Sequence, residues 1–249
     1  NGGPPLYPRC RLARSRMYYT PIHQLLATRG LRSRSPPNAT IAMGRVESGR
    51  LLDALLQPTA RTYVEWGSGG STALVSELIV TGAVPSSFRA FSIESSAKWM
   101  DGLLARSPPM LQAMGKDQLR LVHGDMGATG FLGYPRHFNP DDHARALGYV
   151  RLDKHLSGRK ADVVLVDGRF RLACMLEALA HLHKKRHHTP VVLLHDYMPK
   201  DSVRSSYELA RAAYDFRYTN GTLATLTPKQ HVSRVEMDEL LEQALGWPV

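Results

Sequence analysis

The chain has 249 residues, of which 43% are hydrophobic, and a formal net charge of +10 at pH 7. This length fits one folded domain with an extension, and two cysteines are too few for a small disulfide-stabilised scaffold, so a reducing compartment is expected. The apolar runs are far shorter than the roughly 20 residues that a membrane helix needs, so no transmembrane segment is expected.

The positive charge is concentrated at the N-terminus. Residues 1–46 contain eight arginines and no acidic residue, whereas the rest of the chain carries 24 basic and 22 acidic residues. We therefore divide the chain into a basic, Arg/Pro-rich extension, residues 1–45, and a domain, residues 46–249. Such an extension is typical of an organelle transit sequence or a polyanion-binding tail, and we expect it to pack against its own domain or a partner. It predicts an organellar location, mitochondrial first and cytoplasmic as the alternative, and a protein or RNA partner for residues 1–45.

The domain alternates β-type apolar runs with helical patterns. A short helix is expected around Thr20–Ala27, and an apolar face from Val46 to Leu56 predicts a second helix that Pro58 ends. The predicted strands are Thr62–Trp66, Ala90–Glu94, Leu119–His123, Asp162–Asp167, Val191–Asp196, Phe216–Thr219 and Thr222–Leu226. The predicted helices are Ser71–Val80, Ala97–Ala105, Arg169–His183, Ser202–Tyr214 and Arg234–Leu245.

This alternation predicts an α/β fold, with a doubly wound, mostly parallel sheet covered by helices on both faces. Asn220 and Gly221 form a turn signal between the last two strands, which predicts a terminal antiparallel hairpin. Residues 126–161 interrupt the rhythm between two strands. They fit a substrate-binding flap or a surface insertion equally well.

A glycine-rich turn follows the first strand of the domain. In Glu65-Trp66-Gly67-Ser68-Gly69-Gly70-Ser71-Thr72 the glycines allow a tight turn and a close approach of ligand to backbone, and a helix N-terminus follows. The third glycine of the dinucleotide pattern is replaced by Thr72, and no Lys-Ser/Thr pair follows as in a P-loop. Glu65 would repel a pyrophosphate but suits a ligand that carries an ammonium group and a sulfonium.

Two more acidic residues end the next two strands. Glu94 closes the second strand, where a carboxylate can accept hydrogen bonds from both ribose hydroxyls, and Asp125 follows the third, where it can meet an adenine amino group. Each residue alone is equally well explained as part of a strand-end turn. Three acids at three successive strand ends favour S-adenosylmethionine as the ligand.

These motifs resemble class I S-adenosylmethionine-dependent methyltransferases, from roughly Val46 to Lys229. The resemblance is carried by Glu-Trp-Gly-Ser-Gly-Gly-Ser-Thr, Ser92-Ile93-Glu94, Val-Asp-Gly-Arg-Phe-Arg at 166–171 and Leu-His-Asp-Tyr at 194–197. It implies a Rossmann-like, seven-stranded methyltransferase domain, with cofactor contacts from Glu65, Gly67, Ser68, Gly69, Gly70, Glu94 and Asp125. Ser71 stands where the family more often has glycine.

The fourth and fifth strands end in the candidate catalytic residues Asp167, His195 and Asp196. In similar catechol-type enzymes the matching strand ends bind magnesium. Here Tyr197 replaces the usual Asn ligand and is a poor magnesium ligand, so magnesium is an alternative and no metal ligand is assigned. Without a metal, Asp167 or His195 is a candidate general base, although both residues also fit purely structural roles. Arg169 and Arg171 are candidates for holding an acidic substrate.

Two functions follow. The first is S-adenosylmethionine-dependent O- or N-methyl transfer to an acceptor that the sequence does not identify. The alternative is a catalytically silent methyltransferase-fold subunit of a large organellar ribonucleoprotein or membrane assembly, anchored by its basic extension.

Overall fold

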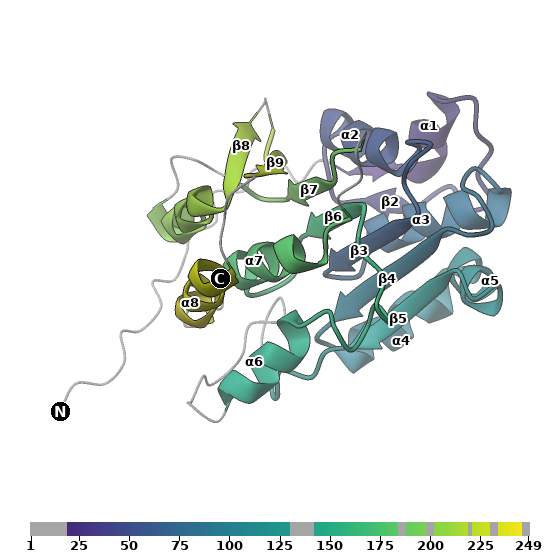
Figure 1. The fold of residues 1–249 in the computed structure, drawn as a ribbon. Coiled ribbons are helices and arrows are strands. Elements are labelled where there is room, and N and C mark those ends of the chain that lie inside the picture. The colour runs from purple at the N-terminus through teal and green to yellow at the C-terminus, as the bar shows by residue number, and fades with distance from the viewer. Residues whose placement is uncertain are drawn as a thin grey trace.

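The computed structural model describes residues 19–129, 142–183, 188–197, 202–218, 221–229 and 234–245. These residues form a seven-stranded sheet with helices on both faces, and a separate two-stranded ribbon near the N-terminus (Figure 1). The predicted doubly wound α/β fold with a terminal antiparallel hairpin is confirmed. Among the described residues, no helix is long and apolar enough to cross a membrane.

The sheet has the strand order β5-β4-β3-β6-β7-β9-β8. The strands are β3 (Thr62–Trp66), β4 (Arg89–Glu94), β5 (Leu119–His123), β6 (Val163–Val166), β7 (Val191–Leu194), β8 (Tyr214–Tyr218) and β9 (Ala224–Pro228). The first five run parallel, and β9 pairs antiparallel with both β7 and β8. The chain steps outward from β3 to β4 and β5 and then returns to β6 on the other side of β3. The crevice between β3 and β6 is therefore the topological switch point, where open α/β sheets bind ligands.

Helices cover the two faces of the sheet in two groups (Figure 1). One face carries α1 (Ile22–Ala27), α2 (Arg45–Leu55), α3 (Gly70–Thr81), α4 (Ala97–Arg106) and α5 (Pro108–Gly115). The other carries α6 (His143–Val150), α7 (Arg171–His181), the 3₁₀ segment η3 (Ser202–Ala212) and α8 (Arg234–Ala244). Alternate strand residues point to opposite faces, so Tyr63 packs with the first group and Val64 with the second.

The described part of the basic stretch packs on the domain. The short strands β1 (Thr20–Pro21) and β2 (Thr40–Ile41) pair with each other, and α1 follows β1 directly. Ile22, Leu25 and Leu26 of α1 are at most 1% exposed and join the core on the α3 face. The folded core therefore begins ahead of residue 46. Residues 1–18 lie outside the described residues.

Some predicted elements have different bounds in the structure. The helix predicted over Ser202–Tyr214 is a 3₁₀ segment that ends at Ala212, and the last two strands run over Tyr214–Tyr218 and Ala224–Pro228. The second half of the interval 126–161 contains α6, whose Tyr149 is buried in the core, while residues 130–141 lie outside the described residues. This half of the interval is thus part of the domain and not a surface insertion.

Candidate functional site

The predicted site residues converge at one edge of the sheet, because the parallel strands all end there. The glycine-rich turn follows β3, Glu94 ends β4, Asp125 lies just beyond β5, Asp167 follows β6, and His195 and Asp196 follow β7. Glu65 does not follow a strand end; it lies inside β3, one residue before the last residue of the strand.

Glycine is required in the turn where the chain segments approach closely. Gly67 has φ +96°, and a Cβ there would lie 2.9 Å from the backbone of Asp167 and Gly168. A Cβ on Gly70 would overlap the backbone of Thr40 and Ile41, so β2 closes one side of the turn. A Cβ on Gly69 would meet nothing within 4 Å, so this part of the turn is open to a ligand.

Glu65 is placed differently from the direct ligand contact that the sequence suggested. The residue is fully buried, and its carboxylate accepts hydrogen bonds from the Tyr63 hydroxyl at 2.8 Å and the Thr72 hydroxyl at 2.5 Å. The same Thr72 oxygen accepts a hydrogen bond from the Gly69 N–H at 2.9 Å. Burial raises the pKa of Glu65 even though these hydroxyls stabilise its charge. Through the Thr72 hydroxyl, Glu65 therefore links β3 to the glycine-rich turn and to the first turn of α3.

Glu94 and Asp125 lie at the surface of the same edge. One Glu94 oxygen accepts from the Ser68 N–H at 3.1 Å, and the other accepts from the Ser96 N–H at 2.9 Å. Asp125 is exposed, and its carboxylate accepts from the Gly127 N–H at 2.8 Å. Both carboxylates are therefore held by backbone groups while oxygen lone pairs remain for a ligand.

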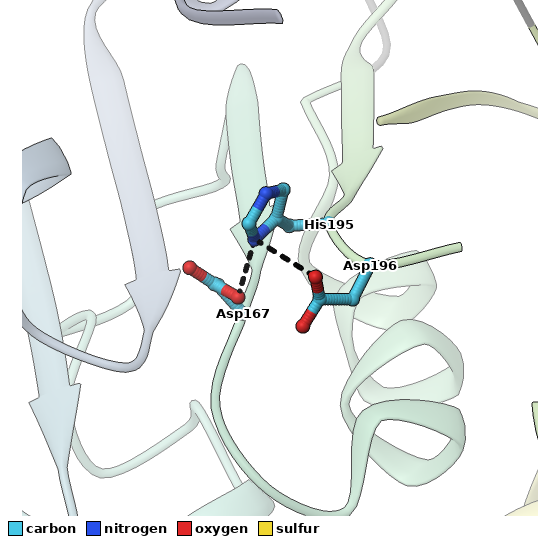
Figure 2. Close-up of side chains that lie close together, drawn as sticks. All are labelled: Asp167, His195 and Asp196. Atoms are coloured by element: carbon cyan, nitrogen blue, oxygen red, sulfur yellow. Dashed lines mark hydrogen bonds and ion pairs between the residues drawn. The ribbon is translucent and has the colours of Figure 1, made fainter. Parts of the chain in front are cut away.

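Asp167 and His195 form a hydrogen-bonded pair across the ends of β6 and β7 (Figure 2). Asp167 Oδ1 lies 2.9 Å from His195 Nδ1, and the nearer oxygen of Asp196 is 3.9 Å from that nitrogen. His195 is 8% exposed, and its Nε2 points away from both carboxylates. Since Asp167 receives the Nδ1 proton, Nε2 is left with the lone pair when the ring is neutral.

Asp167 and His195 each shift the pKa of the other. Burial by itself lowers the pKa of His195, but the charge and hydrogen bond of Asp167 more than offset it, and the pKa is raised above its usual value. Burial likewise raises the pKa of Asp167, but His195 and then Arg171 more than offset this, so the pKa of Asp167 is lowered. Asp167 is thus a weak base, and the basic atom of the pair is on His195.

Arg171 holds the two strand ends together, a role that the sequence did not reveal. It was expected to be a substrate-binding residue, but its side chain is only 4% exposed. Nε donates to the Gly168 carbonyl at 3.0 Å, Nη1 to the His195 carbonyl at 2.6 Å, and Nη2 to the Asp167 carbonyl at 3.1 Å. The guanidinium also contacts the Asp167 and Asp196 carboxylates at 3.2–3.4 Å. Its donors are occupied within the protein, so Arg171 cannot also bind an acidic substrate.

The metal alternative does not fit this geometry. Asp167, His195 and Asp196 place ligand-type atoms within 4.8 Å of one another, as a metal site would. However, His195 Nδ1 is hydrogen-bonded to Asp167, which requires a proton where a metal would need a lone pair, and Arg171 already pairs with both carboxylates. Tyr197 is buried, and its hydroxyl donates to Glu208 at 2.5 Å. The residues therefore do not form a magnesium site.

Glu47 is a residue near the site that the sequence did not single out. It lies in the first turn of α2, where it accepts from the Gly44 N–H at 2.7 Å, and it accepts from the Thr222 hydroxyl at 3.0 Å. Burial raises its pKa, but the hydrogen bonds from Thr222 and Gly44, and then the nearby His195, more than offset this and lower it. A carboxylate three residues after Gly44 matches the capping-box spacing, which is the only sequence signal for it.

Comparisons with known proteins bear on the fold of the chain. No protein-family model and no curated protein sequence matches the chain. The structure resembles a methyltransferase-like protein from Silicibacter pomeroyi with a TM-score of 0.65 and 25% identity, over 84% of this chain and 97% of that one. A TDP-rhamnose 3′-O-methyltransferase of calicheamicin biosynthesis matches with a TM-score of 0.47 and 13% identity, over 83% of this chain and 90% of that one, a likeness too low to carry an argument. The chain therefore has the fold of the class I S-adenosylmethionine-dependent methyltransferases, and the resemblance found in its sequence is confirmed.

Proposed function

We propose that the protein is an S-adenosylmethionine-dependent methyltransferase that methylates a hydroxyl or amine, with His195 as the general base. The observation that carries the proposal is the Asp167–His195 hydrogen bond of 2.9 Å, at the switch point of the sheet and beside the glycine-rich turn. The likeness to a methyltransferase-like protein supports the reaction class.

The sheet edge fits the cofactor. S-adenosylmethionine, when bound, supplies a methyl group on a positively charged sulfur. Glu94 and Asp125 are the carboxylates available to ribose hydroxyls and to an adenine amino group, and the open side of Gly69 permits close approach to the backbone. The buried Glu65 supports the turn through Thr72 and does not bind the ligand directly.

His195 removes the proton that the acceptor loses. Asp167 holds the imidazole in the tautomer whose Nε2 carries the lone pair, and it stabilises the imidazolium that forms. The acceptor oxygen or nitrogen would give its proton to Nε2, while the cofactor would supply the methyl group and leave as S-adenosylhomocysteine. Asp196 and Arg171 are positioning residues, because they fix the two loops on which Asp167 and His195 lie. Alignment and proton removal are the two contributions that such a displacement needs.

Calorimetric titration with S-adenosylmethionine and S-adenosylhomocysteine tests the binding half of the proposal. We expect saturable binding that Glu94→Gln weakens, while Glu77→Gln, a buried glutamate of α3 remote from the strand ends, is the matched control. Absence of binding at millimolar cofactor would refute the proposal. His195→Gln should still bind the cofactor, because the base contacts the acceptor.

A second candidate function concerns the basic stretch. We propose that residues 1–45 bind a protein or RNA partner, which agrees with an organellar, mitochondrial location. Arg32, Arg34 and Arg45 are exposed, and a cavity of about 310 Å³ between α1 and α2 is lined by Arg29, Arg45 and Arg50 together with Leu25 and Val46. Only Asp53 offers a negative charge there, and it pairs with Arg29 at 2.7 Å.

A truncation that tests the basic stretch must leave the buried residues of the fold in place. Removing residues 1–45 would delete the buried side chains of α1, so the informative variant starts at residue 19. Arg32→Glu combined with Arg45→Glu reverses two exposed charges without touching the core. Loss of a co-purifying partner with either variant supports anchoring. Retention of every partner by both variants contradicts it.

A further inference from the structure

Glu47 is a buried carboxylate that the proposed chemistry does not use. It lies in the first turn of α2 and is 7% exposed. One oxygen accepts from the Gly44 N–H at 2.7 Å. The other accepts from both the N–H and the hydroxyl of Thr222, the hydroxyl at 3.0 Å. A capping role accounts for the Gly44 contact but not for two hydrogen bonds from Thr222, a residue of the last hairpin.

The turn between β8 and β9 is shaped to meet Glu47. Gly221 has φ +120°, and a Cβ there would lie 2.6 Å from Glu47 Oε1, so only glycine allows the turn to approach the carboxylate this closely. The start of α2 is itself anchored, because the buried Thr20 hydroxyl donates to the Met43 carbonyl at 2.9 Å. Glu47 therefore gives the turn a fixed point of attachment on α2.

Thr222 also contacts the loop that carries the proposed base. Its carbonyl accepts from the Tyr197 N–H at 2.7 Å. Tyr197 directly follows His195 and Asp196, and Asp196 has φ +58°, a conformation that a residue other than glycine keeps only when its surroundings hold it. Arg171 holds the same loop through the His195 carbonyl, at 2.6 Å. The loop is thus fixed by two contacts, one from Arg171 and one from Thr222.

We infer that Glu47 is a positioning residue for the proposed base, because it fixes Thr222 and, through Thr222, the loop that carries His195 and Asp196. The inference rests on the proposed function of His195 and extends it by one residue from the N-terminal part of the domain. It also assigns a role to the β8–β9 turn, which holds the His195 loop in place.

The charge of Glu47 favours the same state of the base. Burial raises the pKa of Glu47, but its hydrogen bonds and then the charge of His195 more than offset this, so the pKa is lowered and the group is ionised at neutral pH. The other charged groups that face His195 are Asp167, Asp196 and Arg171. Removing the negative charge of Glu47, or loosening the loop and with it the Asp167–His195 hydrogen bond, would lower the pKa of His195.

The experiment measures two quantities in the full chain without ligand: the pKa of His195 by NMR titration and the exchange rate of the Tyr197 amide. We expect Glu47→Gln to lower the pKa and to speed the exchange about fivefold, the approximate effect of losing one hydrogen bond. Glu77→Gln is the matched control, because this buried glutamate of α3 likewise accepts from a backbone N–H and a hydroxyl. It should leave both quantities unchanged.

Two substitutions of Thr222 separate position from charge. Thr222→Val removes the hydroxyl but leaves the charge of Glu47, so both quantities should move as in Glu47→Gln, by less. Thr222→Ser keeps the hydroxyl and should give the values of the unaltered protein. If a Glu47 variant does not fold, this pair decides the question.

Three outcomes would overturn the inference. The first is that both quantities stay unchanged in Glu47→Gln and Thr222→Val, which leaves the proposed function standing. The second is that the pKa of His195 falls in Glu47→Gln while the Tyr197 exchange rate does not change, because the effect is then one of charge alone. The third is that the unaltered protein does not bind S-adenosylmethionine, which removes the proposed base and the inference together.

Discussion

Replacing Asp167 by Asn tests how the proposed base is tuned. The amide oxygen can still accept the His195 Nδ1 proton, so the substitution removes mainly the charge. That charge lies 2.9 Å from Nδ1, and the remaining Asp196 oxygen is 3.9 Å away. An opposite charge at such range shifts a pKa by about 1–3 units, or about 1.4–4 kcal/mol. With it gone, burial is the leading influence, and we expect the pKa of His195 to fall.

The assay is an NMR titration of the imidazole resonances. The chain has 11 histidines, so the His195 signal is identified by its absence in His195→Gln. Asp196→Asn is the matched control, because its charge is farther from Nδ1 and also serves Arg171, so its shift should be the smaller of the two. A pKa of His195 that stays the same or rises in Asp167→Asn would refute the reasoning.

Three further predictions concern the same region. The pKa of His195 is raised in the folded protein, so protonated His195 stabilises the fold fully below its unfolded pKa near 6.5, and this stabilisation is lost as pH rises through the folded pKa. Urea unfolding between pH 6 and 9 should therefore show a fall in the free energy of unfolding, and His195→Gln should lack this fall. Arg171→Met removes this donor from two carboxylates and three carbonyls and should cost about 3–5 kcal/mol of unfolding free energy, whereas an unchanged denaturation midpoint would contradict the role of Arg171 in holding the two strand ends together. Gly168→Ala places a methyl group onto the Tyr149 hydroxyl and should lower stability by about 1–3 kcal/mol, while Gly148→Ala, with nothing within 4 Å, should not lower it.

The sequence predicted the parallel strands well because they are short, apolar and bounded by glycine or acidic residues. Thr62–Trp66 and Leu119–His123 are observed as predicted. The fifth strand was extended too far, because His195 and Asp196 turn away after Leu194 and Asp196 adopts φ +58°. The hydrophobic pattern does not report such a backbone change, because His195 and Asp196 directly follow an apolar run and nothing in that run marks where the strand ends.

The sequence could predict which residues lie at the strand ends that form the candidate site, but it could not predict which side chains contact one another there. Parallel topology brings Glu94, Asp125, Asp167 and His195 to one edge, and this follows from the order of strands and helices. Which side chain points outward depends on tertiary packing. Glu65 was expected to contact the ligand, but it is buried and accepts a hydrogen bond from Thr72. Arg171 was expected to contact the substrate, but its side chain donates to backbone carbonyls. Glu65 meets Thr72 across the glycine-rich turn, and Arg171 reaches His195 and Asp196 at the end of the next strand, so both contacts depend on the folded backbone.

Arg171 also explains how two carboxylates can lie beside His195 without a metal. When His195 is protonated, its charge and that of the guanidinium balance Asp167 and Asp196. When His195 is neutral and able to accept a proton, the cluster retains one net negative charge at the switch point of the sheet. A positively charged sulfur bound there would be attracted by that charge, and it would in turn favour the neutral, basic form of His195. In the proposed mechanism, cofactor binding and activation of the base are therefore coupled. Saturation with S-adenosylmethionine should lower the pKa of His195, whereas S-adenosylhomocysteine, whose sulfur is neutral, should lower it less. Equal shifts with the two ligands would show that the sulfonium charge does not reach this cluster.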